Sequence, residues 1–190
     1  MLIPIFPKLG LIDKELVGRI EALFEKTKSG DVKESVMAEF MNSMTHTILE
    51  DVIENPRVKP QFDKLPGLIG KKLSLHAEGL NPWLIEVVPA PKVLDVKISS
   101  EKEVSDLVGF TGTFEVIKGI VSDSASVDML SEAIFEERLK IVNASPEEPV
   151  IWVRDLFSVV GPIWDRIDLM EKALTNAMPK LDEELKRWGC

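Results

Sequence analysis

The sequence predicts an α+β protein in which an antiparallel β-sheet is covered by helices. Three observations support this fold class. Apolar residues recur at helical spacing near both ends of the chain, the middle alternates with the period of β-strands, and the strands are grouped without a repeating β-α order. We expect a single domain over 1–190, with an N-terminal helical arm at 1–30 and a C-terminal amphipathic helix at 162–190.

Two helices are predicted before the sheet. Asp13 is placed to cap the first, which carries apolar residues at helical spacing and ends near Gly30. Asp31, with Glu34 three residues later, predicts the start of the second helix. This helix should end at Asn55, because a residue that precedes a proline avoids helical backbone angles.

Three strands should follow with short connections. Residues 72–79, 82–88 and 92–100 alternate apolar and polar side chains and are separated by proline-containing turns. Short connections join antiparallel neighbours, so these strands predict an antiparallel meander.

The segment after the meander is expected to return to helix. Ser100 and Glu103 form a capping box that predicts a helix ending at Gly109. The segment 110–121 is apolar but contains two glycines, which should loosen it, and 127–135 predicts a short helix.

The stretch AIFEERLKIVN at 133–143 changes period within a few residues. We expect the helix to end and the last strand to begin here. Phe135 should face inward, and Leu139 and Ile141 should continue the apolar face.

Two helices are predicted after this strand. Ser145 and Glu148 form a capping box for the first. The last carries a regular apolar stripe from Ile167 to Trp188, with Pro179 as a point where it could bend. We expect this stripe to complete the core; a lid over a cavity and a contact with a second copy are the alternatives.

Composition and charge exclude several classes of function. The formal net charge is −9, which disfavours nucleic acid and anionic membrane surfaces as partners. No apolar run reaches the ~20 residues of a membrane span, so an integral membrane protein is not expected. The single cysteine, Cys190, excludes an intramolecular disulfide framework and indicates a reducing, cytoplasmic environment.

Residues suited to catalysis are few. His46 and Glu50 lie one helical turn apart, but no third histidine or cysteine ligand is available, and a surface contact between them is the simpler interpretation. His76 lies in a predicted strand, and Glu137 lies in a charged run. An enzyme that uses His46 and Glu50 as metal ligands or Glu137 as an acid is an alternative. We predict no catalytic residue, no metal and no cofactor.

Large apolar residues are concentrated in the second half of the chain. They extend through 110–135 and continue near 152–157. An ordinary core is the simpler explanation. The alternative is the wall of an apolar cavity with few polar groups, as in lipid-binding sites.

Three segments carry a family resemblance. The segment KLSLHAEGLNPWLIEVV (72–88), the step from Ile98 to Val104 and the segment from Ala133 to Ile141 follow one another in the order of a known domain. On the basis of these three segments, the region 34–160 resembles the sterol carrier protein type-two domain. Glu137 stands where that family has glycine, and we expect the local turn to differ there.

The resemblance implies a sheet of about five strands, covered on one face by helices, with a lipid-filled hydrophobic tunnel between the layers. No catalytic residue is carried over, because the family's lipid-binding domain has none. The cavity-lining positions that it implies are Phe110, Phe114, Ile117, Met129, Ile134, Phe135 and Trp152.

We therefore predict non-enzymatic binding or carriage of a hydrophobic ligand, such as a lipid, fatty acyl or sterol-like molecule. The alternative is a protein–protein interaction module whose core is filled by its own side chains. In that case a second copy of the chain is a candidate partner, and the last helix is the candidate contact.

Overall fold

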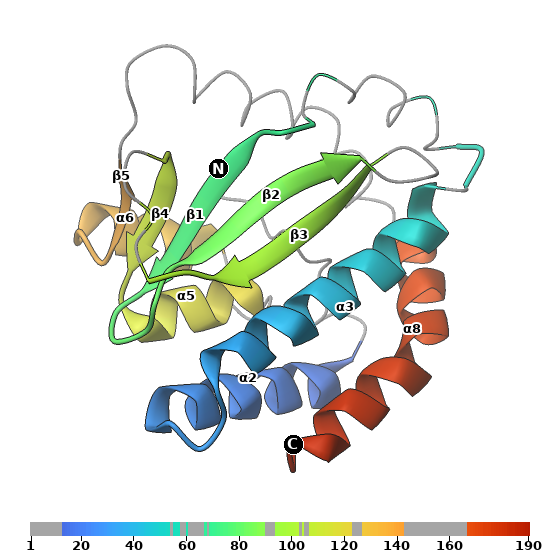
Figure 1. Cartoon of the computed structure of the whole chain (residues 1–190), viewed down its shortest axis with the longest axis horizontal. Helices are drawn as coiled ribbons and strands as arrows, with labels where there is room; N and C mark the ends of the chain where they lie inside the picture. The colour runs from blue at the N-terminus through green and yellow to red at the C-terminus, as the bar shows by residue number, and fades with distance from the viewer. Residues whose placement is uncertain are drawn as a thin grey trace.

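The computed structural model describes residues 13–53, 55–57, 60, 67, 69–89, 94–102, 104, 107–122, 127–142 and 167–190. Helices lie against one face of a twisted five-stranded sheet (Figure 1). The elements follow in the order α2 (Lys14–Ser29), α3 (Glu34–Ile53), β1 (Lys72–Ala77), β2 (Trp83–Pro89), β3 (Leu94–Ser100), β4 (Gly109–Gly112), α5 (Phe114–Val121), α6 (Val127–Phe135), β5 (Leu139–Val142) and α8 (Ile167–Arg187).

The sheet confirms the predicted α+β class and adds a parallel pair. Its strand order is β3-β2-β1-β4-β5. The meander β1-β2-β3 is antiparallel as predicted, and β4–β5 is antiparallel too. Strands β1 and β4 pair in parallel. After β3, which is an edge strand, the chain crosses to the other side of β1, and β4 then runs in the same direction as β1. The sheet is therefore mixed and mostly antiparallel.

The caps of α2 are those that the sequence predicts. The Asp13 carboxylate accepts hydrogen bonds from the backbone N–H groups of Glu15 and Leu16, both at 2.9 Å. Gly30 ends the helix at φ 83°, a left-handed conformation that glycine adopts without steric cost. The helix therefore has local signals at both ends.

The capping box predicted for α3 is not formed. The helix begins at Glu34, and the Asp31 carboxylate accepts a hydrogen bond from the Ser29 hydroxyl instead. The Glu34 carboxylate reaches the sheet, where it accepts from the backbone N–H of Asn81 at 2.9 Å and the hydroxyl of Ser100 at 3.2 Å. Glu34 thus joins the start of α3 to one end of the meander.

The helix predicted between Ser100 and Gly109 is wrong for the residues described there, which are 101, 102, 104, 107 and 108. Ser100 ends β3, and its hydroxyl donates to Glu34 of α3 rather than capping a helix. The backbone N–H of Glu101 then donates to the carbonyl of Pro82. Contacts with distant residues therefore replace the local capping signal.

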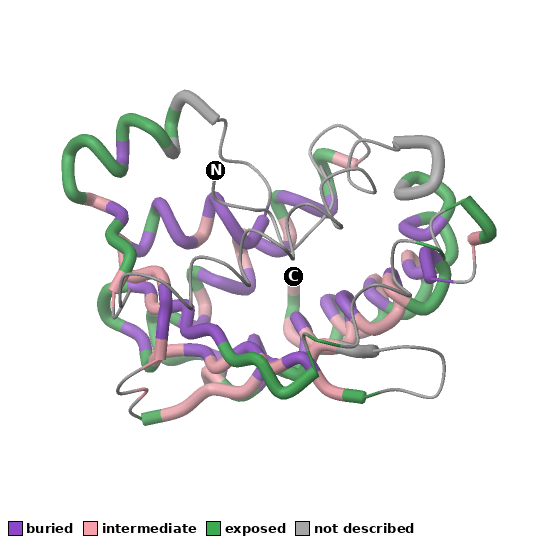
Figure 2. Tube along the Cα trace, turned by 90° about the horizontal axis from the view of Figure 1, so that it is seen from above, coloured by how far each residue is buried: buried purple, intermediate pink, exposed green. Residues whose placement is uncertain are grey.

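The core lies between the sheet and α2, α3, α5 and α8 (Figure 1). Figure 2 shows where the buried residues lie along these elements. Among the α6 residues whose burial is described, all but Ala133 are exposed. Asn42 of α3 forms two hydrogen bonds with the backbone of Ile98 in β3. This polar contact fixes the position of α3 along the edge strand.

The last helix completes the core, as predicted. Its buried residues recur at helical spacing and pack in the same core as those of α3. Pro179 lies inside α8, which continues to Arg187. Within the described residues, none of the helices combines the length and apolar character needed to cross a membrane. The buried residues of α8 are Ala173, Leu174, Ala177, Leu181 and Leu185.

Candidate functional site

An exposed apolar surface is formed by α6 and β5. Its four members, which we call the apolar edge, are Met129, Ile134, Phe135 and Ile141, and their exposed fractions are 55, 49, 89 and 59%. All four belong to two elements that a short turn connects. Exposed apolar surface that gathers in one region can mark a site of interaction with ligands, membranes or other proteins. The apolar edge is therefore the first candidate for a binding site.

The position of α6 and β5 in the fold explains this exposure. Strand β5 is the last in the sheet order, with β4 as its neighbour in the sheet. Among the α6 residues whose side chains are described, Ala133 alone is buried (Figure 2). The chain turns sharply between the two elements at Glu137, whose φ is 58°. Both elements thus lie at the border of the sheet.

A row of apolar side chains leads inward from this edge. The strand register pairs Ile141 with Phe110, Phe110 with Leu75, and Leu75 with Trp83. Directly paired residues lie on the same face of a sheet, so these four side chains form one row across four strands, here called the cross-strand row. Exposure falls along it, from 59% at Ile141 through a half-buried Phe110 to 5% at Leu75 and 0% at Trp83.

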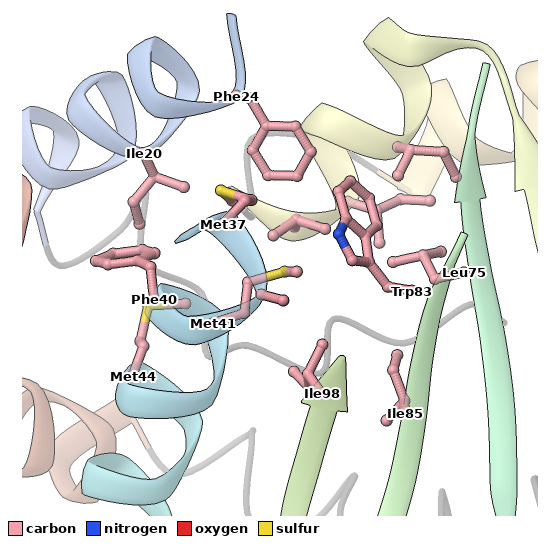
Figure 3. Close-up of a cluster of buried hydrophobic side chains, with 14 of the residues drawn as sticks. Ile20, Phe24, Met37, Phe40, Met41, Met44, Leu75, Trp83, Ile85 and Ile98 are labelled. Atoms are coloured by element: carbon pink, nitrogen blue, oxygen red, sulfur yellow. The ribbon is translucent and has the colours of Figure 1, made fainter. Parts of the chain in front are cut away.

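Aromatic and methionine side chains cover the inner end of the row (Figure 3). The ring of Phe24 in α2 lies edge-on to Trp83, with 5.4 Å between centroids, and 6.1 Å from the ring of Phe114 in α5. Met37 and Met41 of α3 are fully buried beside them. Methionine is unbranched and adapts its shape, so this part of the core can repack more easily than one of β-branched residues.

One polar group at the inner end of the row has no partner. Trp83 is completely buried, and its indole Nε1–H makes no hydrogen bond. The Thr45 hydroxyl of α3 is also buried without a partner. A buried donor without an acceptor costs roughly 1–3 kcal/mol, and such groups in native proteins call for a specific explanation.

The cavity-lining residues predicted from the sequence separate into three groups. Phe114 and Ile117 belong to the closed core, with 4 and 0% exposure, and Phe110 is half-buried and packs against it. Met129, Ile134 and Phe135 lie at the exposed apolar edge. Trp152 lies outside the described residues. A cavity-lining role remains a prediction for all seven.

The prediction that Phe135 faces inward is wrong, because its side chain is 89% exposed. Ile141 does continue the apolar face of the sheet, as predicted, and is 59% exposed at the sheet edge. Leu139 is buried as predicted, at 2% exposure. Ile141 is on the same side of β5 but is paired with the half-buried Phe110 at the sheet edge. Phe135 ends α6 before the turn at Glu137, and among the large apolar residues that the structure describes its side chain is the most exposed.

Sequence reasoning missed the aromatic and methionine residues at the inner end of the row. The alternation within 82–88 does mark Trp83 as inward-facing, and helical spacing marks Phe24 as buried. No local signal shows that residues so far apart in the chain meet. The site therefore includes Phe24, Met37, Met41 and Trp83 in addition to the predicted residues.

Two lysines of the described residues, Lys28 and Lys118, lie at the border of this apolar region. The Lys28 Nζ lies 4.0 Å from the centroid of the Phe114 ring. Burial works to lower the pKa of Lys118, but hydrogen bonds and charges of Glu115 and Glu25 outweigh it and raise this pKa. Lys118 is therefore a cation that ties α5 to Glu25 of α2 at 2.6 Å.

The residues considered for catalysis have structural contacts. The His46 Nε2 lies 3.6 Å from Glu50 Oε1 on an exposed face of α3, which fits the predicted surface contact. His76 lies 3.0 Å from the Leu80 carbonyl through its Nε2. A hydrogen bond from Lys140 lowers the pKa of Glu137, whereas a general acid requires a raised pKa. No group of three metal-ligating side chains occurs within the described part of the chain.

A separate groove of about 240 Å³ lies between the end of α3 and α8. The Asn176 amide donates to the Asp51 carboxylate at 2.8 Å inside it. Its remaining lining residues are Val52, Asn55, Pro56, Lys172 and Ala173. Because polar and charged side chains contribute to its lining and it lies apart from the apolar edge in the fold, we do not assign this groove to a hydrophobic ligand.

Comparisons with known proteins give one fold likeness. No family model matches the chain, and a search of curated proteins finds no significant match. A solved structure described as "UbiJ-SCP2 Ubiquinone synthesis protein" is similar with a TM-score of 0.38 and 15% identity, over 75% of this chain and 94% of that one. This description names the sterol carrier type that the sequence resembles. At this level of similarity the likeness concerns the fold alone and carries no argument about function.

Proposed function

We propose that the protein binds or carries a hydrophobic molecule, such as a lipid, fatty acyl or sterol-like compound, without transforming it chemically. The observation that carries this proposal is the apolar edge and its continuation as the cross-strand row. Four large apolar side chains of these two neighbouring elements are exposed, and the row that begins at Ile141 leads without a charged residue to the buried Trp83.

The hydrophobic effect supplies the driving force. Removing apolar surface from water contributes about 25 cal/mol per Å², or about 1.5–3 kcal/mol for a fully buried large apolar side chain. Phe135 and Ile141 retain most of their surface in water in the free protein. A ligand that covers them recovers this free energy, and the half-buried Phe110 extends the surface toward the core.

Nearby charges are paired rather than directed at a ligand. Arg138 contacts Glu136 at 2.6 Å, and Lys140 contacts Glu137 at 2.8 Å. These exposed pairs keep the turn between α6 and β5 soluble beside an apolar surface. They favour a ligand that is recognised by its apolar body.

A protein–protein interaction module is the second candidate. Its support is the closed inner layer, in which Trp83, Met37 and Phe24 are fully buried against one another. In that case the apolar edge would bind a protein partner or a second copy. The stripe of α8 is a poor contact surface, because its Leu174, Leu181 and Leu185 are buried within the chain.

Substitution of Phe135 tests the first proposal. We expect Phe135→Asp to weaken the binding of Nile red, an uncharged apolar probe, about tenfold or more, since it removes an apolar contact worth about 1.5–3 kcal/mol. Glu132→Gln, on the exposed surface of the same helix, should leave binding unchanged. Fluorescence titration measures both, alongside solvent extraction of the purified wild-type protein.

The two candidates give different results in this experiment. If the wild-type protein retains no lipid and does not bind the probe, the carrier proposal is wrong. If light scattering then shows a dimer that Phe135→Asp dissociates, the apolar edge is a protein contact.

A further inference from the structure

We infer that the Trp83 indole N–H is the polar anchor of the ligand site and donates a hydrogen bond to one uncharged acceptor oxygen on an otherwise apolar ligand. This inference rests on the proposed function and names the class of ligand. The ligand's apolar body would lie along the cross-strand row toward Ile141, with its carbonyl or ether oxygen at the buried end.

The first support is the state of the indole itself. An indole nitrogen can donate but not accept a hydrogen bond, so it must find an acceptor or remain unsatisfied. Trp83 has no exposed surface, and the structure gives its Nε1 no partner. Nearly all buried polar groups in proteins are hydrogen-bonded, so an acceptor from outside the chain would remove the deficit.

The second support is the position of this donor. Trp83 is the buried residue at one end of a row whose other end, Ile141, is exposed. Neighbouring strands are about 4.8 Å apart, so three strand spacings place the two ends about 14 Å from each other. Phe110 and Leu75 fill the interval with apolar surface. A single donor at the end of an apolar path fits an extended ligand with one acceptor.

The surroundings of the indole favour an uncharged acceptor. Its neighbours are the ring of Phe24 and the side chains of Met37 and Met41 (Figure 3). An ionised carboxylate would lose its hydration here, which is costly without an opposite charge. Two cations described at this layer, Lys28 and Lys118, lie over the ring of Phe114, at 4.0 and 5.5 Å from its centroid. Esters, ketones and ethers therefore fit better than ionised fatty acids.

Phe24 is the residue that must give way. Its ring contacts both Trp83 and Phe114, so it occupies the space that a ligand at the indole would need. It is carried by α2, which packs in the core through its other buried residues and is also joined to its neighbours by Lys118–Glu25 and Arg19–Asp182, both at 2.6 Å. A shift of α2 or a change of the Phe24 rotamer would expose the indole to the row.

The test compares methyl dodecanoate with dodecane in the full-length protein. Affinity is measured by displacement of Nile red, and the indole N–H resonance of Trp83 is followed in nitrogen-labelled protein. We expect both ligands to bind and methyl dodecanoate alone to shift this resonance. Trp83→Phe should weaken the binding of methyl dodecanoate about two- to tenfold more than it weakens the binding of dodecane, which is the usual effect of one hydrogen bond.

A second pair of variants tests the inference while Trp83 itself is left unchanged. Phe24→Ala should strengthen methyl dodecanoate binding because it opens space beside the indole. Phe40→Ala removes an equally buried ring of α3 that has no ring contact with Trp83 among those described, and should not strengthen it.

Each outcome decides the inference. If both ligands bind and the Trp83 resonance does not shift, the indole N–H does not donate to the ligand. The inference is then wrong, while the proposed function stands. If ionised dodecanoate shifts the Trp83 resonance and the methyl ester does not, the assignment of an uncharged ligand is wrong. If neither ligand binds, the proposed function fails and the anchor fails with it.

Discussion

Glu137 shows how one residue can hold a backbone conformation that favours glycine. Its φ of 58° lies in the left-handed region, where a side chain clashes with the backbone. Its carboxylate accepts a hydrogen bond from Lys140 at 2.8 Å, which offsets part of this strain. The sequence resemblance places a glycine here, and the structure shows that this site has the conformation that a glycine would adopt freely.

The substitution Glu137→Gly should therefore stabilise the protein. We expect its melting temperature to rise by about 2–4 °C, because relief of the left-handed strain exceeds the loss of one exposed ion pair. Glu137→Ala removes the same pair without relieving the strain and should lower the melting temperature. Thermal unfolding followed by circular dichroism measures both, and equal shifts for the two variants would contradict the strain explanation.

Gly112 has a different role from the one that the sequence suggested. It was expected to loosen an apolar segment, but it ends β4 where the chain approaches β5 closely. A Cβ atom at this position would lie 2.8 Å from the Arg138 carbonyl and 3.4 Å from the Ile117 side chain. The absence of a side chain therefore permits tight packing between β4, β5 and α5.

At the scale of elements, α2 and α8 are joined by polar contacts although they lie at opposite ends of the chain. Arg19 contacts Asp182 at 2.6 Å, and Lys26 donates to the backbone carbonyls of Trp188 and Gly189. The hydrogen bonds from Lys186 and Arg19 lower the pKa of Asp182 from its ordinary value of 3.8. These contacts tie the cover over Trp83 to the C-terminal helix.

This pKa shift predicts a pH dependence of stability. Because the pKa is lower in the folded state, the unfolded state takes up the proton more readily as the pH falls. The contribution of Asp182 is therefore complete above pH 3.8 and is lost as the pH falls through the lowered pKa.

The substitution Asp182→Asn should lower the urea midpoint at pH 7, and its difference from wild type should vanish in strong acid. Glu183→Gln, an exposed neighbour, should show no such difference at either pH. Urea titrations at the two pH values measure this. If the urea midpoint of Asp182→Asn is lower than that of wild type by the same amount at both pH values, the ionised Asp182 carboxylate is not the source of the difference in stability.

At the scale of the whole molecule, the helical layer depends on segments from both ends of the chain. Leu181 and Leu185 of α8 are fully buried in the same core as α3. Leu16, Ile20 and Phe24 of α2 close this layer from the other side. The region 34–160 that resembles a known domain is thus completed by elements outside it.

Truncation of Leu181 tests this dependence. We expect Leu181→Ala to lower the free energy of unfolding by about 2–5 kcal/mol, the usual cost of removing a fully buried leucine side chain. Glu183→Ala, on the exposed surface of α8, should change it by less than about 0.5 kcal/mol. Chemical denaturation compares the variants, and a small effect for Leu181→Ala would show that α8 folds separately from the sheet.

Sequence patterns identified part of the proposed binding surface and missed the rest. They placed Phe110, Phe114 and Met129 in one apolar region, but they turned Phe135 inward, because periodicity shows that a face is apolar without showing what covers it. They could not find the contact between Phe24 and Trp83, since those residues are distant in the chain. The unpaired indole became visible when the surrounding core was defined.

By itself, the sequence determined the local elements: α2 from its Asp13 cap to Gly30, the meander from its alternation, and α8 from its apolar stripe. These depend on residues a few positions apart. Tertiary structure alone decided the parallel pairing of β1 with β4 and the use of Ser100 as a partner for Glu34 instead of a helix cap. It also decided that the row from Ile141 to Trp83 runs from solvent to core, because strand register and burial arise from contacts between segments far apart in the chain.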